Sequence, residues 1–327
     1  KMKKVTMDDV AREAGCSRAQ VSRMLSGKSY VAEELRVRIQ AALKRMNYRN
    51  RANRHRIRLA IIVKEASGLF LYRLLDALMK DILRRKWECC IIPEQNKTLV
   101  SERFYDGAVC SVYAREWARK WAEERGMPLV MLNSYGTAFD NICTIDPDTY
   151  DESRRVLEHL KSLGHRRIAR IHFCAEKKLP RGGDAFLEAA SDLNLAEVRN
   201  FSIDGTKVCL KDTIRPILEQ GFTALFMIHQ HLAVRAAKTI QDAGFRIPED
   251  VSLITYENPG ISEYLTPPHT TLDFDYSAIA KRALDELRLR ILGKEGTGGV
   301  IPVPNKLIVR GSTGPARRES GFPAARG

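Results

Sequence analysis

From residue 59 onward the sequence alternates between short, continuous apolar runs and longer segments with helical periodicity. Leu59–Val63 and Cys89–Ile92 are the first two apolar runs. A strand that is apolar at every position is typical of a sheet covered on both faces. This alternation predicts parallel α/β sheets in two lobes. The further runs occupy residues 107–112, 129–132, 168–172, 224–228 and 251–255, and the helical segments occupy 71–84, 149–163, 184–193, 210–220, 231–243 and 278–292.

The net charge of +14 is concentrated in the first 58 residues. They hold 16 Lys/Arg and 5 Asp/Glu, a net charge of +11, whereas the remaining 269 residues hold 38 and 35. A basic block joined to a near-neutral body is typical of a module that binds a polyanion. A disordered basic tail would carry the same charge, but it would lack the apolar helical periodicity of this block.

The basic block also contains capping and turn signals. Thr6 and Asp9 can cap a first helix, which ends at Gly15, a residue that tolerates the left-handed conformation of a tight turn. Ser17 and Gln20 form the capping pattern of a second helix. Two short helices joined by a glycine-containing turn are a helix-turn-helix.

Further positions in this block support the helix-turn-helix. The small side chain of Ala11 lets the two helices approach closely, and Val21 fills the interface between them. A third helix with an apolar stripe is expected over about residues 33–46. The spacing, the caps and the charge together predict DNA binding.

The second helix of such a motif enters the major groove of DNA. Arg18, Ala19 and Arg23 lie on its outward positions; arginine can donate two hydrogen bonds to guanine, and alanine can contact the methyl group of thymine. The alternative for each arginine is a phosphate contact or a solvated charge. Contacts that set the register without reading bases are expected from Ser17, Gln20, Ser22 and Ser26, and Thr6 is a further expected DNA contact.

Residues 5–17 and 21–27 resemble the DNA-binding headpiece of the lactose/galactose repressor (LacI/GalR) family of bacterial transcription regulators. The resemblance implies that Arg18, Ala19 and Arg23 occupy the base-reading positions. It continues through Arg38-Ile39, Ala42-Leu43 and Asn47-Tyr48, and in the body through residues 158–160, 164–169, 247–252 and 266–271.

The resemblance implies an all-α helix-turn-helix headpiece, over residues 1–48, and an α/β regulatory domain over 59–315. That domain would resemble periplasmic sugar-binding proteins, with two Rossmann-like lobes of parallel sheets and three crossovers between them. We expect lobe 1 at about 59–163 and 275–298, lobe 2 at about 164–273 and 300–315, and a flexible tail from 316 to 327.

The linker at residues 49–58 departs from the family pattern, because it is shorter and lacks the usual proline after Tyr48. The family's linker folds into a hinge helix that wedges a leucine into the minor groove. Ile57 lies at about the wedge position and could unstack a base step. Alternatively, the arginines of the linker, including Arg49, Arg51 and Arg54, bind phosphates or a narrow minor groove, or the linker is a solvated tether.

The resemblance also implies a small-molecule effector, a sugar or sugar derivative, in the cleft where the carboxyl ends of the strands meet. The alternative is that the residues at these positions cap strands and helices, and that the cleft is degenerate and binds nothing. The segment between Ile92 and Gly107 is too short for a full helix with its loops, so the first lobe is expected to be smaller than usual at this connection. The candidate effector contacts are Phe70, Tyr72, Asp148, Arg181, His229, Gln230 and Glu257.

We therefore expect a cytoplasmic, sequence-specific repressor that acts as a homodimer on a pseudo-palindromic operator. A soluble sugar receptor is the alternative from another class, and the headpiece argues against it. No catalytic motif, metal-ligand spacing or cofactor motif is found, so an enzyme is not expected. The chain has no apolar run long enough to cross a membrane, and acidic residues follow its first lysines where a signal peptide would be apolar.

Overall fold

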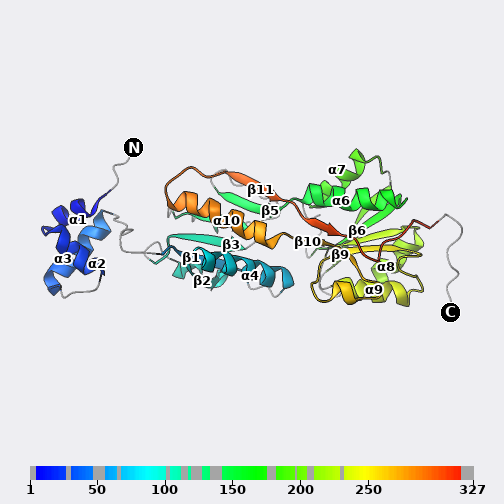
Figure 1. Ribbon diagram of the computed structural model, residues 1–327, viewed down its shortest axis with the longest axis horizontal. Coiled ribbons are helices and arrows are strands. Elements are labelled where there is room, and N and C mark those ends of the chain that lie inside the picture. Colours follow the sequence, from blue (N-terminus) through cyan, green and yellow to red (C-terminus); the bar gives the residue numbers. More distant parts are fainter. Residues whose placement is uncertain are drawn as a thin grey trace.

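A three-helix headpiece precedes two α/β lobes, as Figure 1 shows along the long axis of the molecule. Within the part of the chain described below, no helix is long and apolar enough to span a membrane. The computed structural model describes residues 5–26, 31–46, 56–64, 68–100, 104–111, 117–118, 127–132, 142–174, 182–195, 197–204, 210–228 and 232–317.

The headpiece contains α1 (Met7–Ala14), α2 (Arg18–Ser26) and α3 (Glu33–Arg45), as the sequence predicted. Thr6 caps α1: its backbone N–H donates to the Asp9 carboxylate at 2.8 Å, and its hydroxyl accepts from the Asp9 N–H at 3.3 Å. The expected close approach of the first two helices is confirmed, since the small core buries Val10, Ala11, Ala14, Val21, Ile39 and Ala42.

Lobe 1 is built on a parallel sheet in the order β11-β5-β4-β3-β1-β2. Helices α4 (Leu69–Arg84) and α10 (Tyr276–Ile291) pack together on one face and bury apolar side chains against the strands. Its strands are β1 (Arg58–Val63), β2 (Glu88–Pro93), β3 (Gly107–Ser111), β4 (Leu129–Leu132), β5 (Cys143–Pro147) and β11 (Gly299–Val303).

In the described part of the connection between β2 and β3, residues 94–100 and 104–106, the helical element is a 3-10 helix, Glu94–Leu99. The sequence predicted this shortening, because too few residues separate the two strands to form a full α-helix and its loops.

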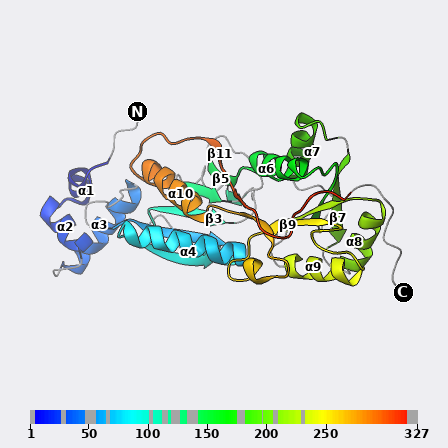
Figure 2. The same cartoon turned by 45° about the vertical axis from the view of Figure 1, so that its right-hand side comes forward.

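Lobe 2 has a sheet in the order β12-β10-β9-β8-β6-β7, in which β12 alone of these strands runs antiparallel to its neighbour. Figure 2 shows α6 and α7 on one side of this sheet and α8 and α9 on the other. The strands are β6 (Arg167–Cys174), β7 (Glu197–Asp204), β8 (Ala224–Met227), β9 (Ser252–Tyr256), β10 (Thr270–Asp273) and β12 (Lys306–Ile308); the helices are α6 (Thr149–Ser162), α7 (Gly182–Asp192), α8 (Leu210–Glu219) and α9 (Ala233–Asp242), with a 3-10 helix at Ser262–Tyr264.

The expected three crossovers are confirmed: the chain passes from β5 to α6, from β10 to α10, and from β11 to β12. Two expected lobe boundaries were wrong. Helix α6 belongs to lobe 2, because its apolar face packs against β6 and α7, and the first crossover therefore lies near Asp148 rather than after residue 163. Strand β11 belongs to lobe 1, because it pairs with β5.

The expected tail was to start at residue 316, but Ala316 still bonds to lobe 2, as do the residues just before it. Ser312 is fully buried, and its carbonyl accepts from the Leu253 N–H at 2.8 Å. The Ala316 N–H donates to the Leu163 carbonyl at 2.8 Å. This segment is ordered because its backbone finds hydrogen-bond partners in the lobe. Residues 318–327 lie outside the described residues.

Candidate DNA-binding surface and interlobe cleft

The outer face of α2 exposes Arg18, Ala19 and Arg23, while Val21 on the opposite face is buried. The side chain of Arg18 is 66% exposed, and its Nη1 lies 3.4 Å from Oδ2 of Asp8 on α1. The three side chains predicted to read bases therefore share one accessible surface. The folding of α2 does not depend on burying them.

Ser17 and Gln20 cap the start of α2. The Ser17 N–H donates to the Gln20 side-chain oxygen at 2.8 Å, and the Gln20 N–H donates to the Ser17 hydroxyl at 3.2 Å. Together with the Thr6 cap on α1, these bonds satisfy backbone groups that helix starts leave unpaired. Ser22 is half-buried, and Ser26 is the last residue of α2.

Ile57 packs against the lobe 1 core. Its carbonyl accepts from the Glu88 N–H at 2.8 Å, and the next residue, Arg58, forms an ion pair with the Glu88 carboxylate at 2.9 Å. A minor-groove wedge would require this side chain to leave the core, so the arrangement does not favour that role. Arg49, Arg51 and Arg54 lie outside the described residues.

The predicted effector contacts do not all lie at one place. Phe70 is in the first turn of α4, while Tyr72 in the same turn is 69% exposed. Asp148 caps α6 by accepting from the Asp151 N–H at 3.0 Å. Arg181, His229 and Gln230 lie outside the described residues.

Glu257 is buried at the end of β9 and is held by its own lobe. Its Oε2 accepts from Arg310 Nη1 at 2.8 Å and from the hydroxyl of Thr271. Together with the Asp148 cap, this arrangement fits the alternative that these carboxylates stabilise strand and helix ends.

Aromatic rings gather where β10 passes into α10. The ring of Phe70 packs edge-on against Phe274, with centroids 5.0 Å apart, and lies 5.5 Å from the ring of Tyr276. Phe274 also packs against Tyr256 at 4.7 Å. Sequence reasoning missed Phe274 and Tyr276, although segment 273–276 lies one residue after the matched family motif at 266–271.

An ion pair joins the two lobes beside these rings. Arg73 of α4 donates through Nη1 to Oδ1 of Asp273 at 2.6 Å, and the second pair of atoms, Nη2 and Oδ2, is 3.4 Å apart. The guanidinium lies 4.4 Å above the ring of Tyr276. Both charged side chains are about one-quarter exposed, at 24% and 25%. Because α4 belongs to lobe 1 and β10 to lobe 2, this ion pair is a direct contact between the two lobes.

A buried carboxylate lies at the crossovers themselves. Glu152, in the first turn of α6, accepts from the Tyr256 hydroxyl at 2.7 Å and from Asn305 Nδ2 at 2.6 Å. Asn305 lies between β11 and β12, so the bond joins the first and third crossovers. Burial raises the pKa of Glu152 to about 7, against the opposing effects of these hydrogen bonds and of the Arg170 charge.

Two family models match the chain. The model of bacterial regulatory proteins of the lacI family matches residues 6–50, and the periplasmic binding protein-like domain matches residues 157–313. The chain belongs to the LacI family. It is a DNA-binding transcription regulator and not an enzyme.

Similar proteins span nearly the whole length of this LacI-family regulator. The NTD biosynthesis operon regulator NtdR of Bacillus subtilis is 25% identical, covering 94% of this chain and 99% of that protein. The transcriptional repressor PurR of Vibrio vulnificus is 26% identical, covering 93% and 97%.

A solved structure of the Lac repressor dimer bound to operator and the anti-inducer ONPF has a TM-score of 0.69 at 20% identity, covering 95% of this chain and 100% of that one. The fold of that structure is therefore shared by the headpiece and both lobes.

Replacing Arg73 with Met should loosen the contact between the lobes of this LacI-family regulator. Loss of a partly exposed, charged hydrogen bond is expected to cost about 1–2 kcal/mol. Solution X-ray scattering should show a larger radius of gyration, and hydrogen exchange should be faster at β10. The swap of Arg73→Asp with Asp273→Arg should reverse both changes. Arg215→Met, which breaks an ion pair within α8, is the control; equal behaviour of the two Met variants would contradict the interlobe role.

Glu152 should make stability depend on pH. Because its pKa is raised from 4.5 to about 7, the folded protein holds a proton that the unfolded chain has lost in this interval. The free energy of unfolding should therefore fall as the pH rises through this window. Glu152→Gln should flatten that decline in urea unfolding measured between about pH 5 and 8. Glu158→Gln, on the exposed face of the same helix, should leave it unchanged; parallel curves for the parent and Glu152→Gln would refute the assignment.

Proposed function

We propose that this regulator represses transcription as a homodimer on a pseudo-palindromic operator. The observation that carries the proposal is the shared exposure of Arg18, Ala19 and Arg23 on a capped second helix. A helix of nine residues can reach only a few base pairs, so two headpieces at a set spacing are needed for high specificity. The Lac repressor structure, which has the same fold, is a dimer on its operator. Acting on chromosomal operators, the protein would be cytoplasmic.

We further propose that the effector is a carbohydrate held between the lobes. Structural neighbours support this class: the regulator CelR was solved with cellobiose (TM-score 0.66), and a LacI-family regulator of Enterococcus faecium with ribose (TM-score 0.66). A ligand with different affinities for two lobe arrangements would shift their populations and so change operator binding. Phe70, which lies on the lobe 1 side of the crossover, is the described ring best placed to stack on a sugar.

One observation favours a second candidate, a regulator that needs no effector. Arg73 of lobe 1 pairs with Asp273 of lobe 2, and the ring of Tyr256 in lobe 2 packs against Phe274, which also packs against Phe70 of lobe 1. The chain's own side chains therefore join the lobes. Such a protein would be controlled by its own abundance rather than by a metabolite.

Selection from random duplex DNA tests operator recognition. The full chain should enrich a site with two related half-sites, and the logarithm of its affinity should fall linearly with log salt, with a slope of about −0.9 per phosphate neutralised. Arg23→Ala should weaken binding to the enriched site by about 1–3 kcal/mol and relax preference at one base pair of each half-site. The measurement is a competition titration against a scrambled duplex. If the base preference of Arg23→Ala is unchanged, Arg23 does not read a base.

A panel of sugars and sugar phosphates separates the two candidates. If the cleft takes a carbohydrate, at least one member should raise the melting temperature and change affinity for the enriched duplex. Phe70→Ala should abolish both effects. If no member changes either quantity, for the parent or for Arg73→Met with its loosened lobes, the effector-free candidate stands.

A further inference from the structure

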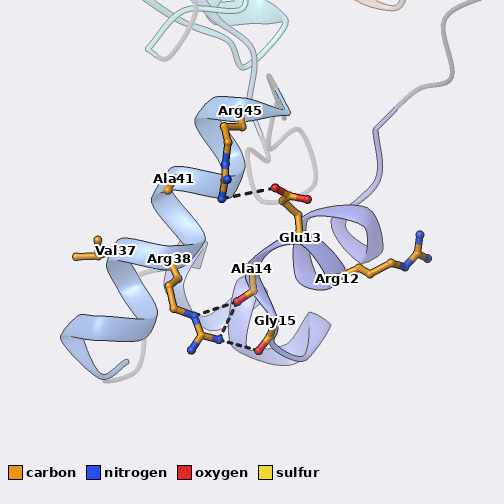
Figure 3. A pocket seen from close by; sticks show the side chains of 8 residues that line it. All are labelled: Arg12, Glu13, Ala14, Gly15, Val37, Arg38, Ala41 and Arg45. Carbon is orange, nitrogen blue, oxygen red and sulfur yellow. Dashed lines mark hydrogen bonds and ion pairs between the residues drawn. The ribbon is translucent and has the colours of Figure 1, made fainter.

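The turn between α1 and α2 is held by a side chain from α3. The last carbonyl groups of a helix have no partner within it. Here the Ala14 carbonyl accepts from Arg38 Nε at 3.1 Å and Nη2 at 2.8 Å, and the Gly15 carbonyl accepts from Nη2 at 2.8 Å. Figure 3 shows the Arg38 guanidinium directed at both residues. One side chain therefore bonds to the last residue of α1 and the first residue of the turn.

The chemistry of arginine suits this position. Its planar guanidinium presents several donors in a fixed fork, which lysine cannot reproduce. A positive charge is also favoured at the carboxyl end of a helix by the helix dipole. A second contact also joins α3 to α1, since Arg45 Nη2 of α3 lies 3.5 Å from the Glu13 carboxylate of α1.

The guanidinium of Arg38, which clamps the two carbonyls, lies directly against Gly15, the glycine of the turn. Gly15 has φ +61°, in the left-handed region. A Cβ at Gly15 would lie 3.2 Å from Arg38 Nη2. Only Cys16 and Ser17 separate this glycine from α2, so the conformation of the turn sets the direction in which the second helix leaves the first.

We propose that Arg38 is a positioning residue for operator recognition. By holding the carbonyls of Ala14 and Gly15, it fixes the angle between α1 and α2 and thus presents Arg18 and Arg23 to base edges, without reading bases itself. This inference rests on the proposed DNA-reading role of α2.

The test compares Arg38→Met with Arg36→Met in the full chain. Both variants remove one positive charge from α3, but Arg36 is exposed, and its guanidinium pairs with Glu33 of its own helix. The probes are the duplex enriched by selection and a scrambled duplex of equal length, titrated over a range of KCl concentrations. Arg38→Met should weaken binding to the enriched duplex by about tenfold. Its affinity for the scrambled duplex and its salt slope should match those of Arg36→Met.

Arg38→Lys keeps the charge and distinguishes positioning from a phosphate contact. It should restore little of the lost preference, because an ammonium cannot bond both carbonyls in the fork geometry. Full recovery with Lys, or equal losses on both duplexes with a salt slope reduced by about 0.9, would show that Arg38 contacts phosphate and would overturn the proposal.

Gly15→Ala guards against a variant that simply unfolds the headpiece. An added methyl group displaces the guanidinium, so the losses from Gly15→Ala and Arg38→Met should be less than additive in a double-mutant cycle on the enriched duplex. Additive losses would overturn the proposal. If instead the parent chain itself does not distinguish the two duplexes, the proposed function fails before this test begins.

Discussion

The arrangement of the two lobes depends on the side chains packed around the three crossovers. Glu152 bonds to Asn305 and so joins the first crossover to the third. It also accepts from Tyr256, whose ring packs against Phe274 at the second crossover. A buried carboxylate is stable only while such partners are present. Relative motion of the lobes must therefore change the surroundings of an ionisable group.

The ion pair between Arg73 and Asp273 acts at the same place but is about one-quarter exposed. Its contribution to stability is consequently smaller, and it can break when the lobes separate. The buried, hydrogen-bonded Glu152 is suited to stay in place as a hinge, while the weaker ion pair between Arg73 and Asp273 is suited to break when the lobes separate on that side.

The headpiece separates residues that fold it from residues that read DNA. Caps formed by Thr6, Ser17 and Gln20 define the helices through local hydrogen bonds, and the base-reading candidates stay exposed. Substitutions at Arg18, Ala19 and Arg23 should therefore cost little stability. The clamp from Arg38 adds a third class of residue, which neither forms the core nor reads bases but sets the geometry of the reading helix.

The sequence alone determined the headpiece, the alternation of strands and helices, the short β2–β3 crossover and the family, because these follow from signals within a few residues: caps, a turn glycine, apolar periodicity and loop length. Strand β5 was not predicted, since it buries the polar Thr144 and Asp146. The placement of α6 in lobe 2 and the bond between side chains 200 positions apart, Arg73 and Asp273, were decided only by tertiary structure. Periodicity shows which face of a helix is buried, but not which of two similar sheets covers it, and a contact across a crossover exists only once both lobes have formed.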